Sequence, residues 1–296
     1  MRRDRPELKE QQSSATRSAG ASKVDRKRRR LVLYFAFEKL APEPYRPRGW
    51  IPVDVNEDSV ALLVEGKVYL LKTGFAQVTK DYFHRRRRMQ SYYDEKYGRG
   101  SRALRRAMRR LREGERKRDW KHKLAKLIAS EALRRGYGIA VEDLDLKAVW
   151  NMLSRIKSKR LRLRIAKACF LGVLRLVEEY AGMHGVPVRR VNPRDTSRLC
   201  PLHGCELKYD GRRVVKCPTG GEEWHRETVG CCNILRKSGE RTPSMPVRPI
   251  VIPREAWTRA KSLRQALELA KDLPREARTL RRIMSRYARF IEALHG

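Results

Sequence analysis

Acidic residues stand at the ends of two apolar segments that lie far apart in the chain. Asp54 is near the end of "WIPVDV", and Glu142 and Asp143 close the apolar part of "YGIAVEDLDL". A sheet that pairs these segments side by side would bring the carboxylates together. Hydrolysis of a phosphodiester with two metal ions needs several acids on a rigid sheet, because Mg²⁺ takes oxygen ligands. The pattern indicates a divalent-metal site, although acids also end strands simply because strands run out into solvent.

Cysteines and histidines form a second cluster of potential metal ligands. Five of the six cysteines fall between positions 200 and 232, which in a reducing compartment favours metal binding over disulfides. Four residues at zinc-like spacing are available: Cys200, His203, Cys205 and Cys217. His225 could replace one of them. The second half of the cluster is incomplete, because "PTGG" follows Cys217 where another ligand is expected at Gly220 or Gly221. The alternative is a decayed site that keeps unpaired thiols.

The charge of the chain predicts a polyanionic partner. The 296 residues include 70 Lys and Arg against 34 Asp and Glu, a formal charge of +36 on a chain that is 41% hydrophobic. Nucleic acid is the commonest partner that neutralises such a charge, whereas small acidic metabolites do not require it. Arginine runs are candidate phosphate contacts: Arg85, Arg86, Arg87, Arg88, Arg105, Arg106, Arg109 and Arg110. Solvated helix faces are the alternative. Tyr92, Tyr93 and Trp120 could stack on bases, or pack in the core in the case of Trp120.

The order of apolar patterns predicts an α/β fold with a mixed sheet and flanking helices. "WIPVDV", "SVALLV" and "VYLLKTG" read as an antiparallel meander, and two further strands follow at Tyr137 and at 186–191. Helical spacing marks 75–133, roughly 159–184 and the tail from 253 to 294. "LVLYFAF" reads as an earlier strand. No apolar run reaches the ~18 residues of a membrane span, so we expect no membrane contact and a cytoplasmic protein.

With these pieces in order, the sequence resembles the TnpB/OrfB family of transposon-encoded proteins, which are relatives of type V CRISPR effectors. "VDVNEDSVALLV" is similar to the first RuvC motif of that family, and "GIAVEDLDL" to the second. "NPRDTSRLCPLHGC" followed by "VVKCPTGGEEWHRETVGCCNIL" is similar to the "TS-x-x-C" zinc ribbon that runs into the third motif. The three blocks occur in the family's order between about Trp50 and Leu235.

The resemblance implies an RNase H-like (RuvC) fold with an inserted zinc ribbon. It places the catalytic acids on Asp54, Glu142 and Glu227, with Mg²⁺ or Mn²⁺ at the acids and Zn²⁺ in the ribbon. Active members cut DNA that a guide RNA selects. Here the third block reads "HRET" from His225 where the family usually has Asp-Arg-Asp, so Glu227 stands at an Asp position. The added methylene is expected to impair cleavage, since a misplacement near 1 Å can cost ~100-fold in rate.

The predicted organisation follows the motifs. It comprises a disordered basic arm (1–30), a remnant of the family's N-terminal wedge-like region (31–49), the RuvC core with its basic helical region (50–191, with 75–133), a zinc-ribbon-like insert (192–224), the third motif and its helix (225–240), and a linker with C-terminal helices (241–296). Family members usually carry a longer region before the first motif.

Two functions from different classes remain open from the sequence. The first is a transposon-associated, metal-dependent DNA endonuclease of the TnpB type, acting on a DNA substrate with or without a guide RNA. The second is a nucleic-acid-binding protein without catalysis, either a regulator or a transposase-derived remnant. A ribosome-associated or RNA-packaging protein would explain the charge but not the three ordered motifs.

Overall fold

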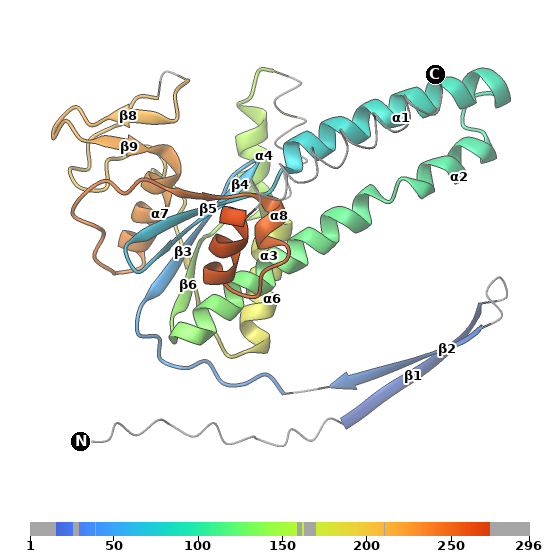
Figure 1. The fold of residues 1–296 in the computed structure, drawn as a ribbon, viewed down its shortest axis with the longest axis horizontal. Coiled ribbons are helices and arrows are strands. Elements are labelled where there is room, and N and C mark those ends of the chain that lie inside the picture. The colour runs from blue at the N-terminus through green and yellow to red at the C-terminus, as the bar shows by residue number, and fades with distance from the viewer. Residues whose placement is uncertain are drawn as a thin grey trace, which may run out of the picture. The chain divides into compact units, whose positions relative to one another are not determined.

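The computed structural model describes residues 16–25, 30–38, 40–158, 162, 170–209 and 211–272 of a chain that forms two compact units, 1–43 and 44–296. In the first unit β1 (Thr16–Asp25) pairs antiparallel with β2 (Arg30–Glu38), as Figure 1 shows. The strand predicted at "LVLYFAF" is confirmed. The disordered arm predicted for 1–30 is wrong over Thr16–Asp25, because main-chain hydrogen bonds to β2 hold a strand without any apolar alternation. The rest of that arm, 1–15 and 26–29, lies outside the described residues.

A six-stranded mixed sheet forms the centre of the second unit. Its strands, in spatial order, are β10 (Ile250–Ile252), β5 (Lys67–Lys72), β4 (Ser59–Val64), β3 (Trp50–Val55), β6 (Gly138–Glu142) and β7 (Val188–Val191). Strands β3, β4 and β5 are the predicted antiparallel meander, whereas β6, β7 and β10 each run parallel to a neighbour. The mixed α/β sheet is therefore confirmed.

The basic region predicted as helical consists of three helices. They are α1 (Phe75–Tyr97), α2 (Arg102–Arg110) and α3 (Glu113–Arg135). Gly98 and Gly100 take positive φ between the first two, and Ser101 caps α2 by accepting a hydrogen bond from the Leu104 amide. In Figure 1, α1 leads away from the sheet and α2 with α3 returns to it. Helix α3 ends beside the sheet and connects directly to β6, the strand that ends at Glu142.

Helices and a small hairpin cover the two faces of the sheet. Helix α3 and α6 (Phe170–Met183) cover one face, where Leu124, Ile128 and Val177 pack on Val53 and Val141. Helix α7 (Arg226–Lys237) and the hairpin of β8 (Val214–Lys216) with β9 (Glu223–His225) cover the other. Helix α4 (Leu146–Ser154) follows β6. Among the helices in the described part of the chain, none is long and apolar enough to cross a membrane.

The C-terminal part adds a strand that the sequence did not predict. The predicted linker from 241 contains β10, a short apolar run beside Pro249 and Pro253, which is followed by α8 (Arg254–Trp257) and a helical stretch over 263–272. Trp257 is fully buried, and its Nε1 donates a hydrogen bond to the Lys72 carbonyl at 2.8 Å. The predicted tail beyond 272 and most of 159–169 lie outside the described residues.

Candidate active site and metal-binding knuckles

The first two predicted acids lie on neighbouring parallel strands. Val53 of β3 is in register with Val141 of β6, so the next residues, Asp54 and Glu142, stand side by side. Side chains alternate between the faces of a strand, and Val53 and Val141 belong to the core beneath α3 and α6. Asp54 and Glu142 therefore face the opposite layer, where α7 lies.

Asp54 is held in close contact with α7. Gly230 of that helix faces the carboxylate so closely that a Cβ at position 230 would overlap Asp54 Oδ2, so a larger residue there would displace this carboxylate. Asn56 Nδ2 donates a hydrogen bond to the same oxygen at 3.0 Å. The pKa of Asp54 is raised to about 7, mainly by burial and next by the charge of Glu142, with a smaller contribution from the charge of Glu227. The hydrogen bond from Asn56 acts in the opposite direction and lowers this pKa.

Glu142 is oriented by a residue that follows β7. The Thr196 hydroxyl donates to Glu142 Oε1, and Asn233 of α7 donates to the Thr196 carbonyl at 2.9 Å. Burial raises the pKa of Glu142, although the Thr196 hydrogen bond and the charge of Lys237 act in the other direction. Thr196 belongs to the "TS-x-x-C" block, which was the only sequence signal for this role.

Glu227 lies in the first turn of α7, where its carboxylate contacts Arg213 and His225. Its side chain is 2% exposed; Arg213 Nη1 contacts Oε1, and His225 Nδ1 lies 2.7 Å from Oε2. Burial opposes ionisation, but these neighbours outweigh it and lower the pKa of Glu227. His225 is thus engaged here and not at the cysteine cluster. No sequence pattern pointed to Arg213.

Asp54 and Glu142 suit a divalent cation by their donor chemistry. Both offer hard carboxylate oxygens, and burial raises the pKa of each, with a further rise at Asp54 from the charge of Glu142, so ionisation of both is unfavourable without a counter-ion. A bound Mg²⁺ would remove that penalty. Among the residues that the structure describes, however, the only group of three or more potential ligands within 4.8 Å of one another is elsewhere. Asp54 and Glu142 therefore stand side by side, whereas Glu227, whose charge acts on Asp54, pairs with Arg213 and lies against His225.

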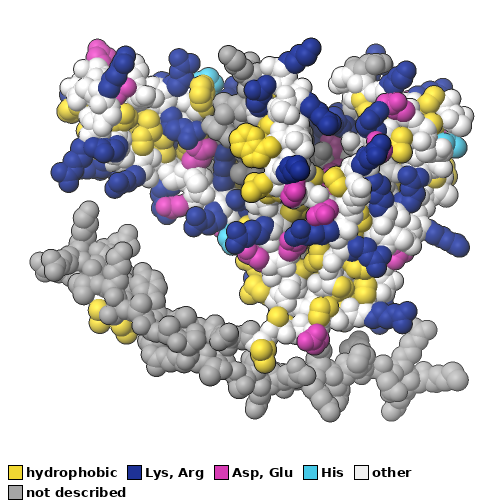
Figure 2. All heavy atoms as spheres, turned by 180° about the vertical axis from the view of Figure 1, so that it is seen from behind, with side chains coloured by type: hydrophobic (Ala, Val, Ile, Leu, Met, Phe, Trp, Pro, Cys, Tyr) yellow, Lys and Arg dark blue, Asp and Glu magenta, His cyan; other side chains and the backbone are white. Residues whose placement is uncertain are grey.

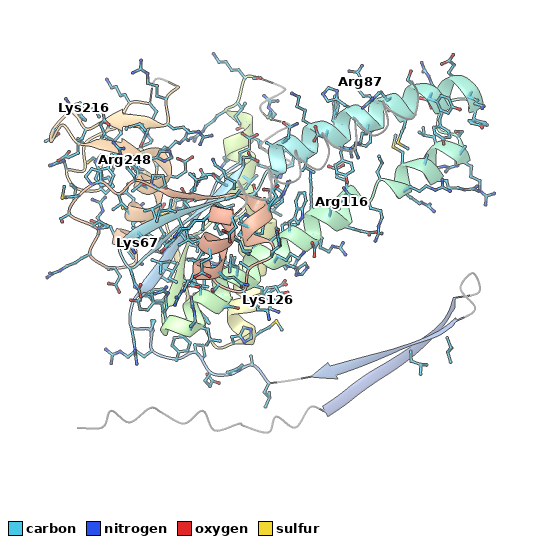
Figure 3. All side chains as sticks on the ribbon, viewed as in Figure 1. Lys67, Arg87, Arg116, Lys126, Lys216 and Arg248 are labelled. Carbon is cyan, nitrogen blue, oxygen red and sulfur yellow. The ribbon has the colours of Figure 1, made fainter. Side chains whose placement is uncertain are left out.

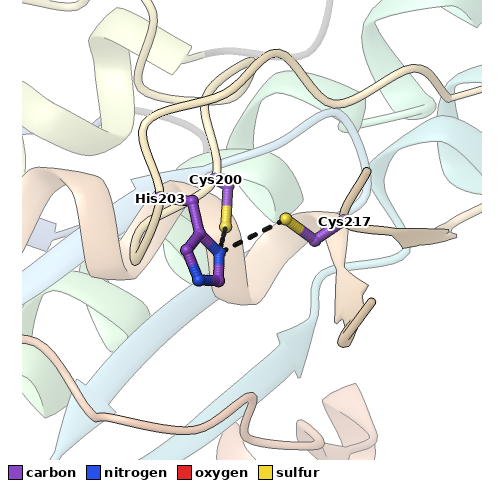
Figure 4. Close-up of side chains that lie close together, drawn as sticks. All are labelled: Cys200, His203 and Cys217. Atoms are coloured by element: carbon purple, nitrogen blue, oxygen red, sulfur yellow. Dashed lines mark hydrogen bonds between the residues drawn. The ribbon is translucent and has the colours of Figure 1, made fainter. Parts of the chain in front are cut away.

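That group is at the predicted zinc cluster. Cys200 Sγ lies 3.7 Å and Cys217 Sγ lies 3.4 Å from His203 Nδ1 (Figure 4). Zn–S bonds of about 2.3 Å and Zn–N bonds of about 2.0 Å put the ligands of a tetrahedral ion roughly 3.5–3.8 Å apart, so these three fit zinc. Cys205 Sγ lies 3.4 Å from Cys217 Sγ but does not join the group.

The environment of Cys217 favours the metal-binding form of the thiol. Burial opposes ionisation, but the Gly220 amide at 3.4 Å and the Cys205 thiol outweigh it and lower the pKa of Cys217 to about 7. Cys231 and Cys232, by contrast, are residues of α7 that are fully buried in the core, and burial raises both of their pKa values. They are therefore packing residues and not ligands of this cluster.

The chain is similar to known proteins in sequence. The family of the Cas12f1-like TNB domain matches residues 171–234, which include the cysteine cluster at 200–217 and most of α7. Over 128 residues the chain is 35% identical to a TnpB-like protein of Methanocaldococcus jannaschii. The chain is a relative of the TnpB family. The matched segment is 43% of this chain and 45% of that relative.

Two solved structures are also similar to this TnpB relative. One is a CRISPR-Cas12f ternary complex, with a TM-score of 0.48 and 18% identity over 79% of this chain and 46% of the other. The second is a Cas12f1–sgRNA–target DNA complex, with a TM-score of 0.49 and 17% identity over 69% and 42%.

The arginines predicted to bind phosphate lie on α1 and α2 of this TnpB relative. All eight are solvent-exposed except Arg86, which is partly buried and pairs with Glu113 at 2.8 Å. Arg87 projects from α1 and Arg116 from α3 in Figure 3, and Figure 2 shows Lys and Arg side chains spread over the face seen there. Tyr92 is 54% exposed near the end of α1. Trp120 instead stacks on Phe75 at 6.0 Å and packs against the core, which is the alternative that the sequence left open.

Proposed function

We propose that this TnpB relative is a transposon-associated, metal-dependent DNA endonuclease with an RNase H-like (RuvC) fold. The observation that carries the proposal is the pairing of Asp54 and Glu142 at the same end of two parallel strands, beneath a helix whose first turn contains Glu227. The antiparallel meander, the two parallel strands beside it and the metal-binding knuckles between β7 and α7 support the same assignment, as they follow the order of the family motifs.

Asp54 and Glu142 are the residues that would hold the catalytic cations. When bound, Mg²⁺ or Mn²⁺ would activate water and stabilise the leaving oxygen of a phosphodiester. Asn56 fixes one oxygen of Asp54, and Thr196 fixes one oxygen of Glu142, so each carboxylate has its second oxygen available for a ligand. Glu227 would join them only after leaving its contacts with Arg213 and His225.

These contacts of Glu227 favour a second candidate function. Both carboxylate oxygens lie against cationic or ring nitrogen groups, and the lowered pKa of Glu227 reflects that stabilisation. A protein in which this arrangement persists would keep only two acids for metal. It would bind nucleic acid without cutting it.

Nucleic acid is the proposed partner in both cases. The exposed arginines of α1 and α2 and the +36 charge suit phosphate, and similar folds have been solved with sgRNA and target DNA. Guidance by RNA is the finer form of the proposal. A discrete RNA species that copurifies with the protein would support it, and heterogeneous or absent RNA would count against it.

A cleavage assay separates the two candidates. Wild-type protein, Asp54→Ala, Glu142→Ala and Asp143→Ala would be incubated with single-stranded and duplex DNA in Mg²⁺ or Mn²⁺, with DNA affinity measured in parallel. Asp143 is the matched control, because it follows Glu142 directly but is 57% exposed. We expect cleavage to be lost in the first two variants and kept in the third, at nearly equal affinity, since phosphate contacts elsewhere dominate binding.

The same assay includes Glu227→Asp, which restores the side-chain length that the family uses and should raise cleavage or leave it unchanged. Wild-type protein that binds DNA but never cuts it in either metal would establish the non-catalytic function. Cleavage that survives in Asp54→Ala would remove Asp54 from the site.

A further inference from the structure

The cysteine cluster consists of two knuckles with the same backbone geometry. In segments 200–205 and 217–222 the first amide donates to the sixth carbonyl at 2.8 Å, and the fifth amide donates to the first carbonyl at 2.9 Å. The fifth residue of each is a glycine with positive φ, 67° and 77°. His203 is therefore the structural counterpart of Gly220, and Cys205 that of Glu222.

This correspondence identifies the missing ligand position. The first knuckle supplies ligands from its first and fourth residues, Cys200 and His203, whereas the second supplies Cys217 from its first residue and has no side chain at its fourth. A tetrahedral zinc ion needs one more ligand, and it would come from the direction of position 220.

Glu222 fills the space that a side chain at 220 would occupy. A Cβ added to Gly220 would overlap both carboxylate oxygens of Glu222 and the His203 ring. Glu222 Oε2 lies 3.7 Å from His203 Nδ1, the atom around which the two thiols gather. This oxygen is buried without a hydrogen-bond partner. An unpartnered buried carboxylate oxygen is costly, and a metal ion would satisfy it.

We propose that Glu222 is the fourth ligand of a zinc site formed with Cys200, His203 and Cys217. Glutamate oxygen is an ordinary zinc ligand at about 2.0–2.2 Å, so a short movement of the carboxylate completes the tetrahedron. Cys205, the other candidate, is already satisfied by its contact with the Cys217 thiol, and a thiol tolerates burial far better than a carboxylate does.

Metal content and cobalt spectroscopy of the full chain test this assignment independently of any cleavage. Zinc would be replaced by Co²⁺, whose sulfur-to-metal charge-transfer band grows with the number of thiolate ligands. Cys205→Ser should keep one metal per chain and the full band. Glu222→Gln should weaken metal affinity by more than the ~10–100-fold cost of losing an outer-shell partner, with an unchanged band per bound ion.

A rescue variant guards against simple misfolding of Glu222→Gln. Glu222→His keeps a zinc-binding side chain at position 222, so it should recover metal binding with an unchanged band per bound ion, because a ring nitrogen replaces the carboxylate oxygen and the two thiolates remain. The proposal is overturned if Cys205→Ser loses about a third of the band while Glu222→Gln binds normally, or if the wild-type chain takes up no zinc. Either result leaves the nuclease proposal standing.

Discussion

Replacement of Asp54 by Asn should stabilise the metal-free protein, and the gain should grow with pH. The folded protein raises the pKa of Asp54 to about 7 from an ordinary value of 3.8, mainly through burial and the charge of Glu142. The native state therefore holds this proton more tightly than the unfolded chain does. Stability associated with it is complete below pH 3.8 and is lost as the pH rises through 7.

The difference between the two pKa values corresponds to about 4 kcal/mol once both states are ionised. Linkage gives about 2 kcal/mol of this at pH 5 and about 4 kcal/mol at pH 8, which are upper figures because Asp54 keeps some contact with water. Asparagine carries no charge, so Asp54→Asn avoids the whole penalty. Its amide oxygen can still accept the hydrogen bond that Asn56 donates.

Urea unfolding in EDTA at pH 5 and pH 8 measures this gain. We expect the free energy of unfolding of Asp54→Asn, relative to wild type, to be about 2 kcal/mol more favourable at pH 8 than at pH 5. Asp143→Asn controls for removing one negative charge from a chain of +36, because that carboxylate is 57% exposed on the neighbouring strand end. Added Mg²⁺ should raise the stability of the wild-type protein at pH 8 and leave that of Asp54→Asn unchanged. An equal difference at both pH values would refute the argument.

Three further outcomes are expected. Gly230→Ala should lower the melting temperature, at a cost of about 1–3 kcal/mol in stability, because its Cβ would overlap Asp54. The control is Gly182→Ala in α6, where a Cβ meets nothing within 4 Å and stability should rise by about 0.5–1 kcal/mol. A gain in both variants would contradict the close contact between Gly230 and Asp54. Arg213→Ala should lower the free energy of unfolding in urea by about 1–2 kcal/mol and raise the pKa of Glu227, because the buried carboxylate then keeps only His225 as a neighbour. The effect is limited because the Arg213 side chain is 64% exposed. Exposed Arg212 is the control for this variant, and equal losses in Arg212→Ala and Arg213→Ala would argue against the ion pair. DNA affinity should fall steeply with salt, and the slope of log K against log salt should be about −0.9 for each phosphate contact. The double variant Arg109→Gln, Arg110→Gln should make that slope shallower by up to about 2, because both side chains are exposed. A wild-type slope near zero would remove the nucleic-acid assignment.

Local patterns in the sequence were sufficient to predict the meander, the mixed sheet and the two acids at neighbouring strand ends. Alternation of apolar residues depends on the two-residue repeat of a strand, so "WIPVDV" and "GIAVE" specify both an element and the face on which Asp54 and Glu142 lie. The close spacing of Cys200 and His203 likewise permits metal binding by one short turn. The order of the three motifs also predicted the relation to the TnpB family, which the 35% identity to a TnpB-like protein over 128 residues confirms.

Contacts between distant segments were decided only by the tertiary structure. Arg213 precedes β8, and it contacts Glu227 only because the β8–β9 hairpin brings it beside the start of α7. β10 pairs through main-chain atoms with residues of β5 that lie 181 positions earlier (250 − 69), and its three-residue apolar run has no period to detect. Glu222 stands near His203 because two knuckles fold onto each other. Such partners depend on where the chain returns in space, and no local repeat encodes that distance.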